Sequence, residues 1–202
     1  MNKLLSTKTA RVISTIFVPP SFTIILFTFF AFYLESTVEK KIITIVVALV
    51  FGFMLQIMLF IFLRRQGKIK DIDASVKEER AMPFLISTGF YLAGLLVLIY
   101  AGINLVSIGF WFCYISNTLI VVFINKSWKI SVHAAGAAGP VAILAFIFGA
   151  TGLWSLVILI MVGWSRVKLK CHNLAQVTAG VLLGFGSTYI QMYLIYHWFG
   201  NG

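Results

Sequence analysis

The most informative stretch of the chain reads Ser165-Arg166-Val167-Lys168-Leu169-Lys170-Cys171-His172-Asn173-Leu174-Ala175-Gln176. Apolar runs flank it on both sides, residues 153–164 before it and residues 174–198 after it. Polar groups that a membrane-spanning chain keeps close to the bilayer are costly, and they usually mark a functional site. The spacing Ser-Arg-x5-His-x3-Gln can put a guanidinium and an imidazole around one small anion. We therefore expect a loop between two spans that carries an anion-binding site.

The composition is that of an integral membrane protein. The chain has 202 residues, of which 60% are hydrophobic and only 11% are charged, whereas soluble domains average about 25% charged residues. We expect a single integral membrane domain over residues 1–202, with a motif-bearing core at about 64–198. The net charge of +10 is explained by anionic lipid headgroups and by the charge bias of membrane topology. No soluble basic domain exists to hold a nucleic acid, so nucleic acid is excluded as a partner.

The apolar runs predict an all-α, polytopic transmembrane helix bundle with six to seven spans. Residues 12–34 form the first expected span, bent or loosened at Pro19-Pro20 because proline lacks the N–H of a helix interior. Residues 84–124 are 41 nearly uncharged residues, about twice the roughly 20 that one crossing needs, so we expect a hairpin that turns near residues 102–109. The other expected spans are 42–63, a helix from 134 to a turn at 149–152, a short 153–164, and 174–198.

Three polar loops, residues 64–83, 125–133 and 165–172, are separated by even numbers of expected crossings. They therefore share one face of the membrane with the N-terminus. This face holds 14 of the 16 Lys and Arg residues, and only Lys40 and Lys41 lie opposite. Positively charged loops favour the cytoplasmic side. We expect a multi-pass protein of a prokaryotic plasma membrane with the three loops and the N-terminus in the cytoplasm.

The second polar loop brings Ser131 and His133 directly to the start of a small-residue helix, Ala134-Ala-Gly-Ala-Ala-Gly139. A helix N-terminus offers unpaired N–H groups and a positive dipole end, which together favour an anion. Small residues also let helix backbones approach closely, and Gly180-x3-Gly184 on the last span can do the same. The first loop supplies the cations Lys77 and Arg80. Alternatively, the basic residues of these loops only reach for lipid headgroups, and His172 only caps the last helix.

Taken together, the three loops resemble the type 2 phosphatidic acid phosphatase superfamily, the lipid phosphate phosphatases. The family pattern is Lys-x6-Arg-Pro, then Pro-Ser-Gly-His, then Ser-Arg-x5-His-x3-Asp. The third motif matches except for Gln176 in the place of Asp, and the second keeps Ser131 and His133. The first is the most divergent, because Asp73 stands seven residues before Arg80 where the pattern has Lys. The resemblance covers roughly residues 70–184 and implies a phosphatidic acid phosphatase type 2-like core.

The resemblance also implies a mechanism. His172 attacks the phosphorus and becomes a phosphohistidine, while His133 protonates the leaving oxygen. Phosphate-binding roles fall to Lys77, Arg80, Ser131 and Arg166, and Gln176 orients His172 in place of the family's Asp. A carboxylate of the first loop, Asp71 or Asp73, could supply the missing negative charge. No metal and no cofactor are implied.

The expected function is that of a membrane lipid phosphatase. A polyprenyl phosphate or diphosphate is the first choice of substrate, and a glycerolipid phosphate such as phosphatidic acid or phosphatidylglycerol phosphate is the second. One alternative is a weak or inactive family member that binds or transports anionic lipid phosphates. Another is a Mg²⁺-dependent intramembrane prenyltransferase, which would use Asp71-x-Asp73. The expected partners are the lipid phosphate and the surrounding membrane lipids, and a homo-oligomer is compatible with the sequence.

Overall fold

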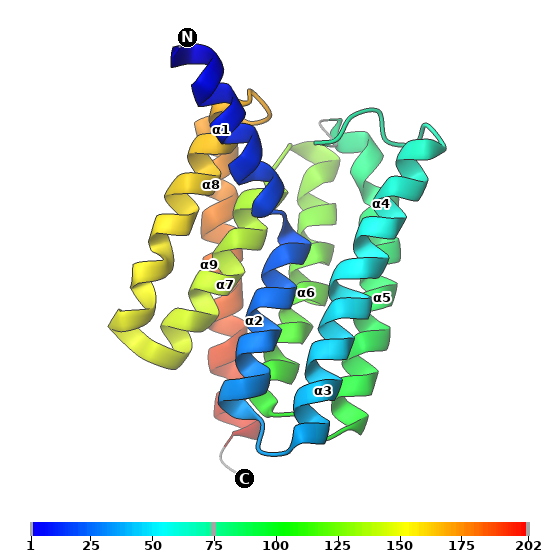
Figure 1. Ribbon diagram of the computed structural model, residues 1–202, viewed down its shortest axis with the longest axis vertical. Coiled ribbons are helices and arrows are strands. Elements are labelled where there is room, and N and C mark those ends of the chain that lie inside the picture. The colour runs from blue at the N-terminus through cyan, green and yellow to red at the C-terminus, as the bar shows by residue number, and fades with distance from the viewer. Residues whose placement is uncertain (1, 74–75, 201–202) are drawn as a thin grey trace.

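The computed structural model describes residues 2–73 and 76–200, and every regular element in these ranges is helical (Figure 1). This agrees with the predicted all-α class. In chain order the elements are α1 (Asn2–Ile16), α2 (Pro19–Leu34), α3 (Val38–Val47), η1 (Ala48–Met54), α4 (Leu55–Arg65), η2 (Lys77–Arg80), α5 (Ala81–Tyr100), α6 (Leu105–Ser127), α7 (Val132–Phe148), η3 (Gly149–Ser155), α8 (Leu156–Lys168) and α9 (Leu174–Phe199).

Among the described residues, five helical stretches are long and apolar enough to cross a membrane, and a bent pair brings the number to six. The pair is α1 and α2, which meet at an angle of 53°. Helix α2 begins at Pro19-Pro20, where proline fixes φ and needs no intrahelical N–H partner. The predicted bend at these prolines is confirmed. These helices fit a multi-pass membrane protein.

One of the five stretches, Val132–Lys168, folds back on itself at η3, so that α7 and α8 pack side by side (Figure 1). The reversal begins at Gly149, whose φ of 59° suits glycine. Helix α8 has 13 residues and rises by about 20 Å, which is short of the roughly 30 Å hydrocarbon core. The described residues therefore contain five or six candidate spans. This range overlaps the predicted range of six to seven spans only at six.

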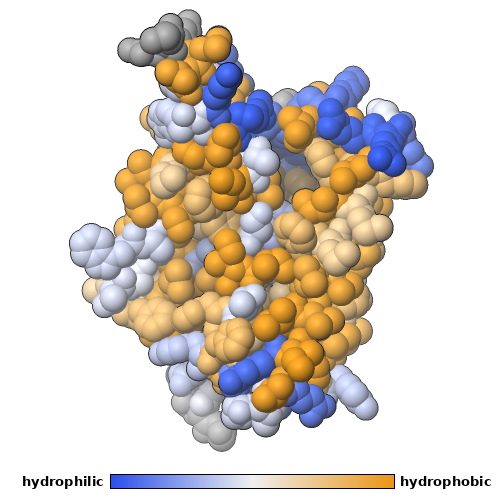
Figure 2. All heavy atoms as spheres, viewed as in Figure 1, coloured by the Kyte–Doolittle hydropathy of each residue, from blue (hydrophilic) through white to orange (hydrophobic). Residues whose placement is uncertain are grey.

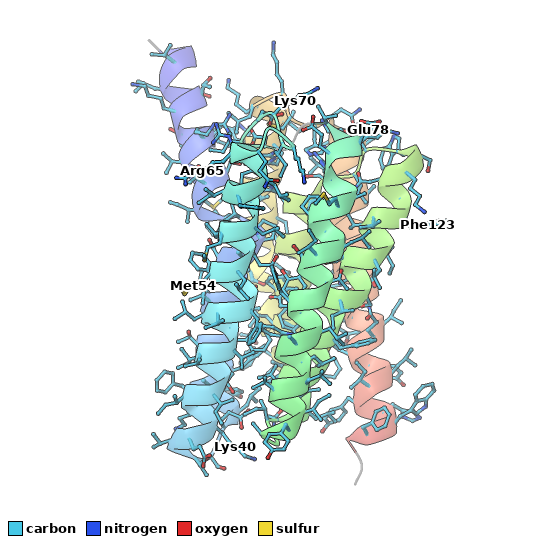
Figure 3. The ribbon with its side chains drawn as sticks, turned by 90° about the vertical axis from the view of Figure 1, so that its right-hand side faces the viewer. Lys40, Met54, Arg65, Lys70, Glu78 and Phe123 are labelled. Atoms are coloured by element: carbon cyan, nitrogen blue, oxygen red, sulfur yellow. The ribbon has the colours of Figure 1, made fainter. Side chains whose placement is uncertain are left out.

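The polar loops gather at one end of the bundle. Figure 3 places Arg65, Lys70 and Glu78 at this end and Lys40 at the other, and Figure 1 shows that α1 and the link between α8 and α9 lie at the loop end too. Figure 2 shows hydrophilic residues at both ends and a predominantly hydrophobic band between them. The predicted common face of the three loops and the N-terminus is confirmed, whereas its cytoplasmic location stays a prediction.

Helices α7 and α9 approach each other more closely than ordinary side chains would allow. A Cβ atom at Gly180 would overlap the carbonyl oxygen of Ser131, and one at Gly184 would overlap that of Ala135. Small residues permit such backbone contact inside a membrane, where dispersion between closely packed helices stabilises the bundle. This close approach, which the sequence predicted, fixes the start of α7 against the start of α9.

Helix α9 is also held against α6 by a polar cluster. Asn117 donates to Thr188 Oγ1 over 3.0 Å and accepts from Ser187 Oγ and Gln191 Nε2 at 2.7 and 3.1 Å. These side chains satisfy one another, which lowers the cost of placing them in an apolar environment. The cluster and the glycine contacts together set the position of α9, which begins directly after His172.

Enlarging Gly184 should separate α7 from α9. We expect Gly184→Ala to lower the free energy of unfolding by about 1–3 kcal/mol, because the new methyl group meets backbone that has no room to move. The thermal unfolding midpoint in detergent should fall by about 2–4 °C for each kcal/mol. Gly186→Ala on the same helix is the matched control, since nothing lies within 4 Å of a Cβ there. An equal shift in both variants would contradict the proposed contact.

Candidate active site

The link between α8 and α9 turns His172 back over Arg166. Helix α8 ends at Lys168, and Lys170 then adopts a left-handed conformation with a φ of 56°. The backbone N–H groups of Cys171 and His172 both donate to the carbonyl oxygen of Arg166, at 3.1 and 3.3 Å. Because the turn closes on the carbonyl group of Arg166 itself, the five-residue spacing of the motif brings the backbone of His172 back to that of Arg166.

Gln176 fixes the orientation of the His172 ring. Its Oε1 atom lies 3.0 Å from His172 Nδ1 and also accepts the backbone N–H of Asn173 at 3.3 Å, as part of a capping box that begins α9. Only the oxygen of an amide can accept that N–H, so the amide cannot flip without breaking the cap. The Nδ1 atom must therefore carry the proton. The lone pair of His172 is on Nε2, where a nucleophile needs it.

The environment keeps His172 neutral. Burial and the charges of Arg80, Lys129 and Arg166 together lower the pKa of the imidazole to about 3, although the hydrogen bond to Gln176 opposes the shift. Only 7% of His172 is exposed. At neutral pH the ring is thus unprotonated, which is the form that can attack an electrophile.

His172 lines a cavity of about 280 Å³ together with Arg80, His133 and Asp73. Arg80, the last residue of η2, is 3% exposed and donates from Nη1 to the carbonyl oxygen of Ile130 at 3.1 Å. His133 is the second residue of α7. Below these polar groups the cavity extends between apolar and aromatic side chains of α4, α5, α6 and α7, among them Phe60, Tyr91, Phe110, Tyr114 and Pro140. The cavity therefore has a polar end and an apolar interior.

Arg166 is fully buried and is paired with a carboxylate. Its Nη1 atom donates to Asp73 Oδ1 at 2.7 Å and to Ser14 Oγ at 2.6 Å. The other oxygen of Asp73 accepts from Arg11 Nη1 at 2.8 Å. The Nε atom of Arg166 is buried and has no hydrogen-bond partner among the described residues. An unsatisfied donor of this kind is costly, and an oxygen of a bound anion would satisfy it.

Asp73 remains ionised in this position. Although burial raises the pKa of its carboxyl group, the hydrogen bonds and charges of Arg11 and Arg166 outweigh that effect and hold the pKa at about 2. A fully buried guanidinium without a counter-ion is strongly destabilising. Asp73 therefore contributes to the stability of the fold as well as to the charge of the site.

The remaining predicted residues lie at different distances from the cavity. Ser131 caps α7, with Oγ accepting the N–H of Ala134 at 3.4 Å, and its own N–H donates to the carbonyl oxygen of Gln176 at 3.2 Å. Lys77 instead donates to the carbonyl oxygens of Lys126 and Ser127 at the end of α6, at 3.2 and 3.3 Å. The structure thus brings Arg80, His133 and His172 to one cavity and places Gln176 beside His172. Arg166 is joined to this cavity through its ion pair with Asp73. Ser131 lies at the start of α7, and Lys77 lies at a neighbouring helix end.

Sequence reasoning missed three residues of this site. Lys129 donates from Nζ to the carbonyl oxygen of Cys171 at 2.8 Å, and its pKa is lowered by burial and by the charge of Arg80. Arg11 and Ser14 reach the site from α1, outside the motif-bearing core. Lys129 could have been noticed, since it precedes Ser131 by two residues. Ser14 gave no signal beyond one hydroxyl in an apolar run.

Acidic residues of the first loop do not replace the family's Asp beside His172. Asp73 pairs with the two arginines, and Asp71 Oδ1 accepts the backbone N–H of Asp73 at 2.8 Å. Within residues 2–73 and 76–200, no group of three or more His, Cys, Asp or Glu side chains is arranged to hold a metal ion. The acceptor for His172 Nδ1 is thus a neutral amide.

Removing the charge of Asp73 should change how stability depends on pH. Because its pKa falls from 3.8 to about 2 on folding, its contribution is present above pH 3.8 and is lost as the pH falls toward 2. At neutral pH, Asp73→Asn should lower the free energy of unfolding by about 2 kcal/mol. Thermal unfolding at pH 7 and at pH 2.5 measures this, and the difference between the proteins should shrink at the lower pH.

Glu78→Gln is the control for this prediction. Glu78 is exposed and forms only a surface pair with Lys77 at 3.8 Å, and such pairs contribute little. A loss of stability in Glu78→Gln as large as that in Asp73→Asn would show that the effect comes from net charge rather than from the buried pair.

Comparison with known proteins finds no relative of this chain. No family model matches it, and neither a curated protein nor a solved structure matches it.

Proposed function

We propose that this protein is a membrane phosphatase that hydrolyses a lipid phosphate or diphosphate through a phosphohistidine formed on His172. The observation that carries the proposal is the state of His172. The Nδ1–H group of His172 donates a hydrogen bond to Gln176, and the His172 side chain lines a cavity with Arg80 and His133. The motif resemblance to the type 2 phosphatidic acid phosphatase superfamily supports it independently.

The proposed reaction has two steps. First, the lone pair of His172 Nε2 forms a bond to phosphorus while the bond to the leaving oxygen breaks, and His133 gives that oxygen a proton. Second, water attacks the phosphohistidine, His133 takes the proton from the water, and the N–P bond breaks to release inorganic phosphate. Arg80 and Arg166 would neutralise the charge on the non-bridging oxygens, which is the main contribution that a protein makes to phosphoryl transfer.

The cavity supports a lipid as the substrate. Its apolar part is walled by side chains such as Phe60, Phe110 and Val121, which cannot hydrogen-bond to a sugar or nucleotide. We propose a polyprenyl phosphate or diphosphate first and a glycerolipid phosphate second. The loop end of the bundle would face the cytoplasm, as the excess of Lys and Arg predicts.

A second candidate is a protein that binds anionic lipid phosphates without cleaving them. Two observations favour it: Arg166 is already paired with Asp73, and the acceptor on His172 is uncharged. A Mg²⁺-dependent prenyltransferase receives less support, because both carboxylate oxygens of Asp73 are engaged by arginines. Insensitivity of turnover to EDTA would separate the phosphatase from the prenyltransferase.

His172→Ala should abolish phosphate release from every lipid phosphate that the native protein cleaves. A 10⁶-fold loss is the order of magnitude expected for a nucleophile, so the residual rate should be undetectable. The assay measures phosphate release by purified protein from polyprenyl and glycerolipid phosphates. With a substrate labelled on phosphorus, native protein should also retain an acid-labile label.

His197→Ala is the control, since His197 is exposed near the end of α9. Full activity in His172→Ala would refute the phosphohistidine.

Gln176→Asp should raise the pKa of His172, because a carboxylate stabilises the protonated imidazole where the amide does not. A close opposite charge raises such a pKa by about 1–3 units. Protonated His172 cannot attack, so the acid limb of kcat/KM against pH should move upward by that amount. An unchanged limb would contradict the role of Gln176. Activity that appears only in Gln176→Asp would instead support the binding protein.

A further inference from the structure

A second hollow opens beside the candidate active site. Its volume is about 620 Å³, and it lies between α1 with the start of α2 on one side and the helix that ends with α4 on the other. Figure 2 shows a hollow in this region, below the hydrophilic end of the molecule. We call it the α1–α4 groove.

The α1–α4 groove is apolar at one end and basic at the other. Phe53, Ile57 and Ile61 line it at four-residue intervals, which places them on one face of the spanning helix Val38–Arg65. Arg64 and Arg65 follow at the loop end, and Arg11 faces them from α1. A lipid has the same layout, with a chain in the hydrocarbon region and an anionic headgroup at the surface. Basic residues near the membrane surface attract anionic headgroups.

The groove adjoins the cavity that His172 lines. The two share the side chains of Ile57, Phe60, Asp73 and His133. Asp73 stands at the junction, where one oxygen pairs with Arg11 of the groove and the other with Arg166 of the active site. A phosphate that moves from the groove toward His172 therefore meets Asp73 first.

We propose that the α1–α4 groove is the docking site for an anionic lipid phosphate, whose phosphate group binds at Arg11, Arg64 and Arg65 before it passes Asp73 toward His172. The proposal rests on the proposed function for the identity of its occupant. A phosphate carries up to two negative charges and three acceptor oxygens, so one group can bind more than one of these guanidinium groups.

Docking is tested by narrowing the groove with Ile61→Trp. The control is Met58→Trp on the same helix, because Met58 is 60% exposed, Ile61 is 45% exposed, and only Ile61 lines the groove. The probe is a long-chain alkyl phosphonate in phosphatidylcholine nanodiscs, which has no ester bond to cleave. We expect Ile61→Trp to weaken its binding by about tenfold or more, which corresponds to about 1.4 kcal/mol, and Met58→Trp to leave it unchanged. Unchanged binding in Ile61→Trp, or equal losses in both, would overturn the docking site.

Hydrolysis assays distinguish a failure of the docking site from a failure of the proposed phosphatase activity. In Ile61→Trp, release of phosphate from a long polyprenyl phosphate should fall, whereas release from a short water-soluble alkyl phosphate should not. If neither substrate is cleaved by the native protein, the phosphatase fails and the phosphonate binding still decides the docking site. If both substrates are cleaved and both rates fall equally in Ile61→Trp, the groove is not the route.

Charge provides a second test that does not depend on a bulky side chain. The double variant Arg64→Gln, Arg65→Gln should weaken phosphonate binding, and Lys68→Gln, which lines neither hollow, should not. Asp73→Asn should strengthen binding by about threefold or more, because Arg11 then no longer pairs with a carboxylate and can bind the phosphonate instead. Weaker or equal binding in Asp73→Asn, in protein that elutes as a folded species, would contradict phosphate binding at Arg11.

Discussion

The buried guanidinium of Arg166 is the interaction on which the rest of the site depends. A charge with no exposure to water must be neutralised locally, and the printed sequence places its two partners far apart in the chain: Ser14 on α1 and Asp73 in the first loop. Arg11 then holds Asp73 from its other side. This one requirement explains why the N-terminal helix bends back over α8 and why the first loop lies across the end of the bundle.

The second constraint is the contact between α7 and α9. Because Gly180 and Gly184 let the two backbones meet, the N–H of Ser131 reaches the carbonyl oxygen of Gln176. The second and third motifs are therefore held by the same pair of helix starts. His133 and His172 belong to these two starts, so their separation is set by helix packing rather than by loop conformation. A site built on rigid elements in this way is better able to hold a reacting group in place.

The parts that the sequence predicted are those with local causes. The bend at Pro19-Pro20, the reversal at Gly149 and the pairing of His172 with Gln176 four residues later all follow from backbone preference or helical spacing. The partners of Arg166 could not be predicted, because they lie 93 and 152 residues away in the chain and no periodicity connects them. Asp73 was considered as a carboxylate for His172, but its carboxylate pairs with the arginines instead. Lys77 was expected at the phosphate, but the end of α6 offers it unpaired carbonyl oxygens closer by.

The position of the negative charge bears on which phosphate this site would cleave. The family pattern has a carboxylate beside the nucleophilic histidine, whereas here the carboxylate lies on Arg166 and His172 has a neutral partner and a pKa of about 3. A weakly basic nucleophile attacks more slowly and depends more on a good leaving group. The alkoxide released from a phosphate monoester is about as basic as hydroxide, whereas the lipid monophosphate released from a diphosphate is a far weaker base, with a conjugate acid of pKa about 6. A weakly basic His172 would therefore cleave a phosphoanhydride bond more readily than a phosphate ester bond. We infer that a lipid diphosphate, which contains such an anhydride bond, suits the proposed phosphatase better than a lipid monophosphate.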